Sequence, residues 1–66
     1  MKIILNGKET NNDTFKNLEE LVASSAAKIE GIVVELNGKI IRKNQWKEQP
    51  LKEGDKIELI QFVGGG

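Results

Sequence analysis

The chain has 66 residues and forms one small domain, which buries only about 60% of the surface that its unfolded chain exposes. Ten basic and ten acidic side chains give a formal net charge of zero, so we expect neither nucleic acid nor a membrane as a partner. Cysteine, histidine and tyrosine are absent, and these are common nucleophiles and proton donors. Composition therefore predicts a protein that is not an enzyme, binds no metal or cofactor, and works at its surface or at one end.

The N-terminal segment begins with an apolar run over residues 1–5, which is too short for a signal peptide or a membrane helix. Because a cysteine-free domain suits a reducing compartment, we expect a cytoplasmic location. Asn6-Gly7 follows this run and is a strong hairpin signal, since both residues tolerate the positive φ of a type I′ turn. The sequence predicts a strand over 1–5 and a returning strand over 8–11.

A single helix is predicted next. Apolar residues recur at helical spacing across residues 18–29. Asn17 precedes them as a candidate N-cap, and Glu20 stands three residues later, as in a capping box. We expect the helix to span 18–28 and to end before Gly31.

The second half of the chain has the pattern of three short strands. We expect these strands over residues 32–36, 39–42 and 56–63. Asn37-Gly38 supplies a second hairpin turn between the first two of them. Residues 44–50 form an irregular stretch, and we expect Trp46 to lie over the edge of the core in a short helical turn.

The order of elements is two strands, a helix and three strands. We expect the first and last strands to lie side by side at the centre of the sheet, because they are the most apolar. This order is typical of an α+β, ubiquitin-like β-grasp fold, with a mixed sheet of four to five strands and one helix packed on one face. The predicted domain covers residues 1–63, and residues 64–66 form a flexible C-terminal glycine tail.

The last strand carries a candidate docking patch. Side chains alternate along a strand, so Ile57 and Leu59 are expected to face the helix. Ile60 and Phe62 would then lie on the open face and, together with Val63, position the tail in a partner. The alternative is that Phe62 folds over the edge of the sheet or fills the core.

The glycine tail is the candidate functional site. Gly64 and Gly65 have no side chains, so their backbone fits a narrow channel, and three extended residues reach roughly 10 Å. The only reactive group there is the terminal carboxylate of Gly66. A carboxylate is a poor electrophile, and the sequence shows no phosphate loop, metal cluster or nucleophile to activate it. Either a partner activates this carboxylate, or the tail is an inert end.

Four segments carry a family resemblance through their order and spacing, and they are residues 1–8, 18–21, 34–41 and 51–58, followed by Gly65 and Gly66 as the terminal pair. Together they resemble the ThiS family, the sulfur carriers of thiamine (thiazole) biosynthesis. The resemblance implies that an E1-like (ThiF-like) adenylyltransferase uses ATP and magnesium to adenylate Gly66. Sulfur from a cysteine desulfurase would then give a thiocarboxylate. A thiazole synthase (ThiG-like) would take the sulfur, with Gly64 and Gly65 threaded into its active site.

Two alternatives stay open at the level of sequence. The small subunit of molybdopterin synthase is a β-grasp carrier with the same tail chemistry, but its members often carry proline where Gln61-Phe62-Val63 stands here. A ubiquitin-like interaction module with an inert tail is the alternative from another class. Removal of Gly66 would leave the activity of such a module intact, whereas it would abolish sulfur transfer by a carrier.

Overall fold

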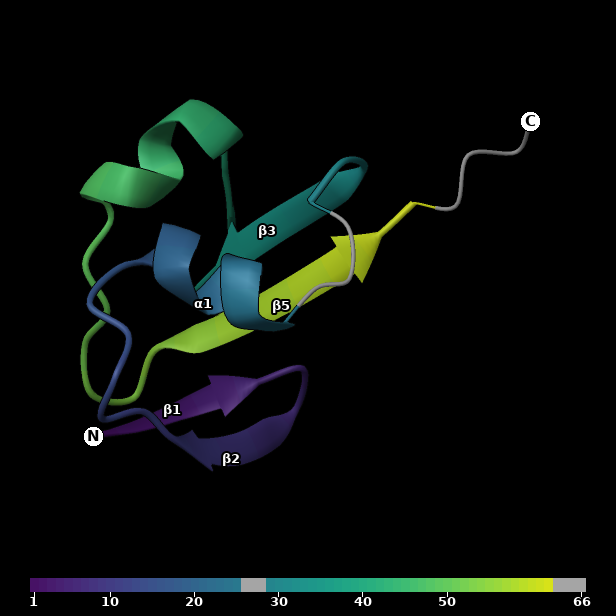
Figure 1. Cartoon of the computed structure of the whole chain (residues 1–66). Coiled ribbons are helices and arrows are strands. Elements are labelled where there is room, and N and C mark those ends of the chain that lie inside the picture. The colour runs from purple at the N-terminus through teal and green to yellow at the C-terminus, as the bar shows by residue number, and fades with distance from the viewer. Residues whose placement is uncertain (26–28, 63–66) are drawn as a thin grey trace.

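The computed structural model describes residues 1–25 and 29–62, and its sheet has the strand order β2-β1-β5-β3-β4 (Figure 1). The strands are β1 (Lys2–Leu5), β2 (Lys8–Asn11), β3 (Ile32–Leu36), β4 (Lys39–Ile41) and β5 (Lys56–Gln61). The helices are α1 (Leu18–Ser25) and the short 3-10 helix η1 (Lys43–Glu48).

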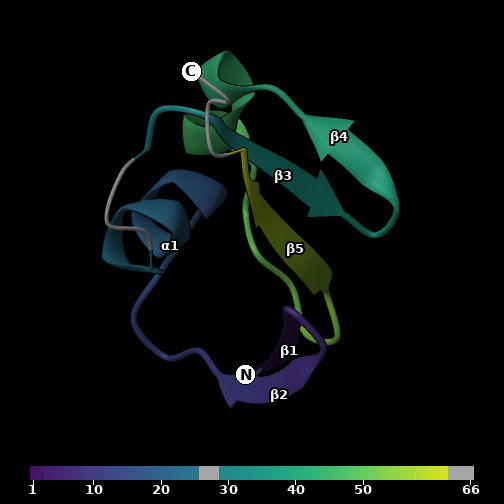
Figure 2. The ribbon, with the colours of Figure 1, turned by 90° about the vertical axis from the view of Figure 1, so that its right-hand side faces the viewer.

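The sheet is mixed, and α1 packs on one of its faces (Figure 2). Strand β1 runs antiparallel to β2 and parallel to β5, while β3 runs antiparallel to both β4 and β5. This confirms the predicted α+β arrangement and the pairing of the first and last strands. The prediction that both occupy the centre holds only for β5, because the β3–β4 hairpin lies on the other side of β5 and leaves β1 second in the order.

Both Asn-Gly pairs form the predicted hairpin turns. Asn6 and Gly7 have φ values of 50° and 82°, and Asn37 and Gly38 have values of 52° and 85°. These positive angles are those that a type I′ turn requires. The strand after the second turn ends at Ile41, one residue earlier than expected.

Helix α1 begins where the capping residues predict. The Oδ1 of Asn17 accepts a hydrogen bond from the backbone N–H of Glu20 at 2.9 Å. The Glu20 carboxylate accepts in turn from the N–H of Lys16 at 3.0 Å, one residue before the N–H used in a standard capping box. The helix is described to Ser25, and its predicted end at residues 26–28 falls outside the described residues.

The core lies between α1, η1 and the sheet. Its buried apolar residues are Ile3, Leu18, Leu21, Val22, Val34, Leu36, Trp46, Leu51 and Ile57. Trp46 lies in the predicted helical turn, but it is a full member of this core, with only 3% of its surface exposed. Its indole N–H donates to the Ile41 carbonyl at 2.9 Å, so the polar atom of this buried ring is satisfied.

Candidate functional site

The start of β5 is fixed within the sheet. Ile57 is fully buried, and Leu59 packs against the core, as the alternation predicts. On the β1 side, the N–H of Asn6 donates to the Ile57 carbonyl at 2.9 Å. The Asn6 side chain then accepts from the Leu59 N–H at 2.8 Å, so this turn residue extends the hold of β1 on β5 beyond the end of β1.

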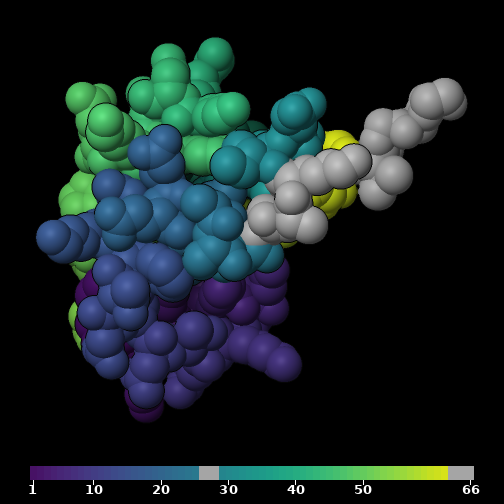
Figure 3. Space-filling model, in the orientation of Figure 1, coloured from purple at the N-terminus to yellow at the C-terminus, as the bar shows by residue number. Residues whose placement is uncertain are grey.

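The end of β5 is exposed. Ile60 and Phe62 expose 37% and 62% of their surfaces, so Phe62 does not fill the core. Seen from the helix side, the end of β5 emerges at the margin of the molecule, beyond the part covered by α1 (Figure 3). The docking role of Ile60 and Phe62 stays a prediction. The other predicted site residues, Val63, Gly64, Gly65 and Gly66, lie outside the described residues.

Two further apolar residues share the open face with the end of β5. Val33 on β3 stands directly opposite Ile60. Ile40 on β4 is 66% exposed and lies one step further along the sheet, opposite Glu35. We call Val33, Ile40, Ile60 and Phe62 the open-face patch. Sequence reasoning missed Val33 and Ile40, although the same alternation places them opposite to the core-facing Val34 and Ile41.

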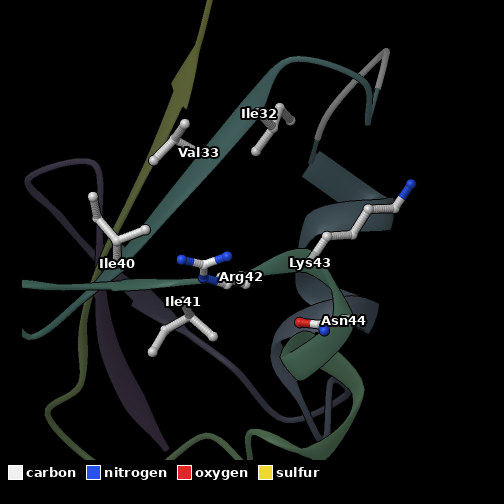
Figure 4. A pocket seen from close by; sticks show the side chains of 7 residues that line it. All are labelled: Ile32, Val33, Ile40, Ile41, Arg42, Lys43 and Asn44. Carbon is white, nitrogen blue, oxygen red and sulfur yellow. The ribbon is translucent and has the colours of Figure 1, made fainter.

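Beside the open-face patch lies a shallow hollow of about 420 Å³ (Figure 4). Its lining consists of Ile32, Val33, Ile40, Ile41, Arg42, Lys43 and Asn44. The apolar side chains come from β3 and β4, and the Arg42 guanidinium lies among them, whereas the Lys43 side chain extends away from them (Figure 4). The hollow is wide open, so it suits a protruding surface of another protein better than a small molecule.

Charged residues occupy the other end of the open face, where Glu35, Glu58 and Lys56 line one small hollow. Glu35 and Glu58 stand directly opposite each other on β3 and β5, and both are half-buried. Like charges in this position destabilise a sheet.

Within residues 1–25 and 29–62, no group of three or more acidic side chains is arranged to hold a metal ion. No helix in these ranges has the length and apolar character that crossing a membrane requires.

Comparison with known proteins identifies the family. The ThiS family model matches residues 3–66, which is nearly the whole chain. The chain belongs to the ThiS family. The sulfur carrier protein ThiS of Bacillus subtilis is 39% identical over 64 residues, which cover 94% of this chain and 96% of that protein. Membership in this family of sulfur carriers of thiamine biosynthesis favours it over the small subunit of molybdopterin synthase.

A solved ThiS structure has the same fold. The crystal structure of the thiamine biosynthesis protein ThiS from Geobacter metallireducens aligns with a TM-score of 0.84 and 33% sequence identity, over the full length of both chains. This likeness confirms the β-grasp assignment.

Two relatives are much longer proteins. The thiazole synthase of Paramagnetospirillum magneticum is 32% identical over 66 residues, and that of Magnetococcus marinus is 35% identical over 66 residues. In each case the match covers 100% of this chain and 20% of the relative. The chain thus spans about a fifth of the length of these thiazole synthases, and in both of them a ThiS-like segment is part of the same polypeptide.

Proposed function

We propose that the chain carries sulfur as a thiocarboxylate on its C-terminal residue, Gly66, and donates it to the thiazole of thiamine. The observation that carries this proposal is that the family match extends through the glycine tail to Gly66. The fold supports it, because the tail directly follows β5, the central strand of the sheet. Because β5 is paired on both sides, it fixes the place from which the tail leaves the sheet.

The chemistry requires two steps, and a partner performs both. An oxygen of the Gly66 carboxylate attacks the α-phosphorus of ATP, and pyrophosphate leaves with its magnesium ion. The resulting acyl-adenylate is a good acyl donor. A sulfide equivalent, derived from a cysteine desulfurase, then displaces AMP and leaves the thiocarboxylate. We propose that an E1-like, ThiF-like adenylyltransferase holds the ATP and magnesium and that this chain binds no cofactor.

The open-face patch is the proposed contact with these partners. Its apolar side chains lie at the end of β5 and just after it, on the adjacent strand β3, and on β4 beyond β3. Burial of such a patch in a partner supplies affinity, while the glycines of residues 64–66 enter the partner's active site. The long relatives named thiazole synthase support a ThiG-like thiazole synthase as the acceptor of the sulfur.

Removal of Gly66 tests the proposal. The truncated chain still ends in a glycine carboxylate, so only the reach of the tail changes, by roughly 3.5 Å. We expect sulfur transfer to a thiazole synthase to be lost. We also expect the thermal unfolding midpoint to stay the same, since Gly66 lies beyond the predicted domain of residues 1–63. Full transfer by the truncated chain would instead support an inert tail. If the full-length chain transfers sulfur only to a large molybdopterin synthase subunit, the result would support the molybdopterin pathway.

A further inference from the structure

The turn between α1 and β3 holds the end of β5. The backbone N–H of Phe62 donates to the Gly31 carbonyl at 2.9 Å. The side-chain Nε2 of Gln61 donates to the Glu30 carbonyl at 2.8 Å. One backbone bond and one side-chain bond therefore tie the last two described residues of the chain to a single short turn.

Gly31 makes this contact close. Its φ is +81°, and a Cβ built on it would lie 3.0 Å from the Phe62 carbonyl oxygen and 3.4 Å from Nε2 of Gln61. The other described glycines with positive φ are Gly7, Gly38 and Gly54, and a Cβ on any of them would meet no heavy atom within 4 Å. Among the glycines that the structure describes, only Gly31 needs to lack a side chain because another strand lies against it.

The contact with the Glu30–Gly31 turn is important because β5 pairs with β1 only along its first residues. The β1–β5 ladder pairs Ile4 with Lys56 and Leu5 with Ile57, and the Asn6 side chain adds one bond to Leu59. Beyond Leu59, the backbone hydrogen bonds that β5 makes within the described residues all go to β3 and to Gly31. The Gln61–Glu30 bond thus supplies a second point of attachment where the strand has one remaining neighbour.

We propose that Gln61 and Gly31 are positioning residues for the reaction at the tail. They fix the direction in which the chain leaves the sheet, so a larger fraction of docked molecules presents the Gly66 carboxylate in reach of the activating centre. This inference rests on the proposed function. The Gln61 side chain reaches Glu30, whereas the open-face patch lies on the opposite face, so positioning and docking are separable.

The first test compares Gln61→Leu with Gln49→Leu. Gln49 is a matched control, because its side chain also donates to a backbone carbonyl, that of Pro50 at 3.3 Å, but it follows η1 and this bond involves neither β5 nor the Glu30–Gly31 turn. With a ThiF-like enzyme, we expect Gln61→Leu to lower the kcat of adenylation about fivefold, the equivalent of one net hydrogen bond, and to leave KM for the carrier unchanged. Hydrogen exchange at the Phe62 amide should accelerate by a similar factor. Gln49→Leu should change neither quantity.

The second test compares Gly31→Ala with Gly54→Ala. Gly54 has a φ of +83°, so alanine strains the backbone equally at both positions, but only at position 31 does the new Cβ press on β5. We expect a loss of stability for both variants, larger for Gly31→Ala because the Phe62 carbonyl must also shift, and a lower kcat only for Gly31→Ala.

The outcomes separate this inference from the proposed function. If the wild-type chain is adenylated and Gln61→Leu keeps the wild-type kcat and Phe62 exchange rate, the positioning role is wrong and the carrier function stands. A rise in KM with unchanged kcat would also overturn the positioning role. If no ThiF-like enzyme adenylates the wild-type chain, both proposals fail together.

Discussion

The two ends of strand β5 are only a few residues apart, yet their surroundings differ. At its start, Ile57 is fully buried, and both neighbouring strands pair with it. At its end, Ile60 and Phe62 are exposed, and the support comes from β3 and the Glu30–Gly31 turn. One strand thus stabilises the fold at one end and carries exposed apolar side chains toward the proposed site at the other.

The largest expected effect is a loss of stability when isoleucine is replaced by alanine at the start of β5, compared with the same replacement near its end. Ile57→Ala removes a fully buried side chain, and we expect it to lower the free energy of unfolding by about 3 kcal/mol. Ile60→Ala, on the exposed part of the same strand, should cost less than about 1 kcal/mol. Urea unfolding measures both values. Equal losses at the two positions would contradict the contrast between the ends.

A somewhat smaller loss is expected just before β5. Asp55 is buried, and its carboxylate accepts from the Asn37 side chain at 3.0 Å and from the Lys52 N–H at 2.8 Å. Asp55→Ala leaves both donors without this partner, and we expect a loss of about 2 kcal/mol. Asp13→Ala is the control, because Asp13 forms an exposed ion pair with the N-terminus, which contributes little. Thermal and urea unfolding that rank Asp13 above Asp55 would refute this anchoring role.

At the exposed end, the expected effect is on binding. Phe62→Ala should raise the KM of the carrier for a ThiF-like enzyme about tenfold, as expected for an aromatic side chain at an interface. The free energy of unfolding should change by no more than about 0.5 kcal/mol, because Phe62 is mostly exposed. Phe15→Ala should lower the free energy of unfolding and leave KM unchanged, since Phe15 packs against the core. A fall in kcat at unchanged KM for Phe62→Ala would assign Phe62 to positioning and not to docking.

The smallest effect is expected at the middle of the strand. Glu58 faces Glu35 across the β3–β5 ladder, so Glu58→Gln should raise the free energy of unfolding by about 0.5 kcal/mol. Glu9→Gln is a suitable control, because Glu9 faces a positive charge, with 3.5 Å between its carboxylate and the Lys2 ammonium. The gain at Glu58 should shrink in high salt, which screens the repulsion. A loss of stability at Glu58 would show that the carboxylate has a favourable partner.

Local signals in the sequence predicted much of this fold. The Asn-Gly pairs specify their turns through their own backbone preferences, and Asn17 and Glu20 mark the start of α1 through bonds within one turn. Alternation along residues 56–61 correctly separated the buried Ile57 from the exposed Ile60. Each of these features depends on residues that are close in sequence.

Features that depend on distant pairing were missed. The prediction of a central β1 was wrong, because the β3–β4 hairpin joins the free side of β5 and leaves β1 second in the order, which no local pattern states. The open-face patch gains Val33 only through the register that sets it opposite Ile60. The close approach of Gly31 to Phe62 likewise requires the pairing of β3 with β5, so Gly31 could be predicted only as the end of a helix.

The central claim is that the C-terminal carboxylate of this chain carries sulfur. The most direct test is the intact mass of the chain after incubation with ATP, magnesium, a cysteine desulfurase system and a ThiF-like adenylyltransferase, followed by mapping of its C-terminal peptide. We expect a mass gain equal to the replacement of one oxygen by one sulfur, located at Gly66. An unchanged mass with an adenylyltransferase that modifies the Bacillus subtilis sulfur carrier under the same conditions would contradict it.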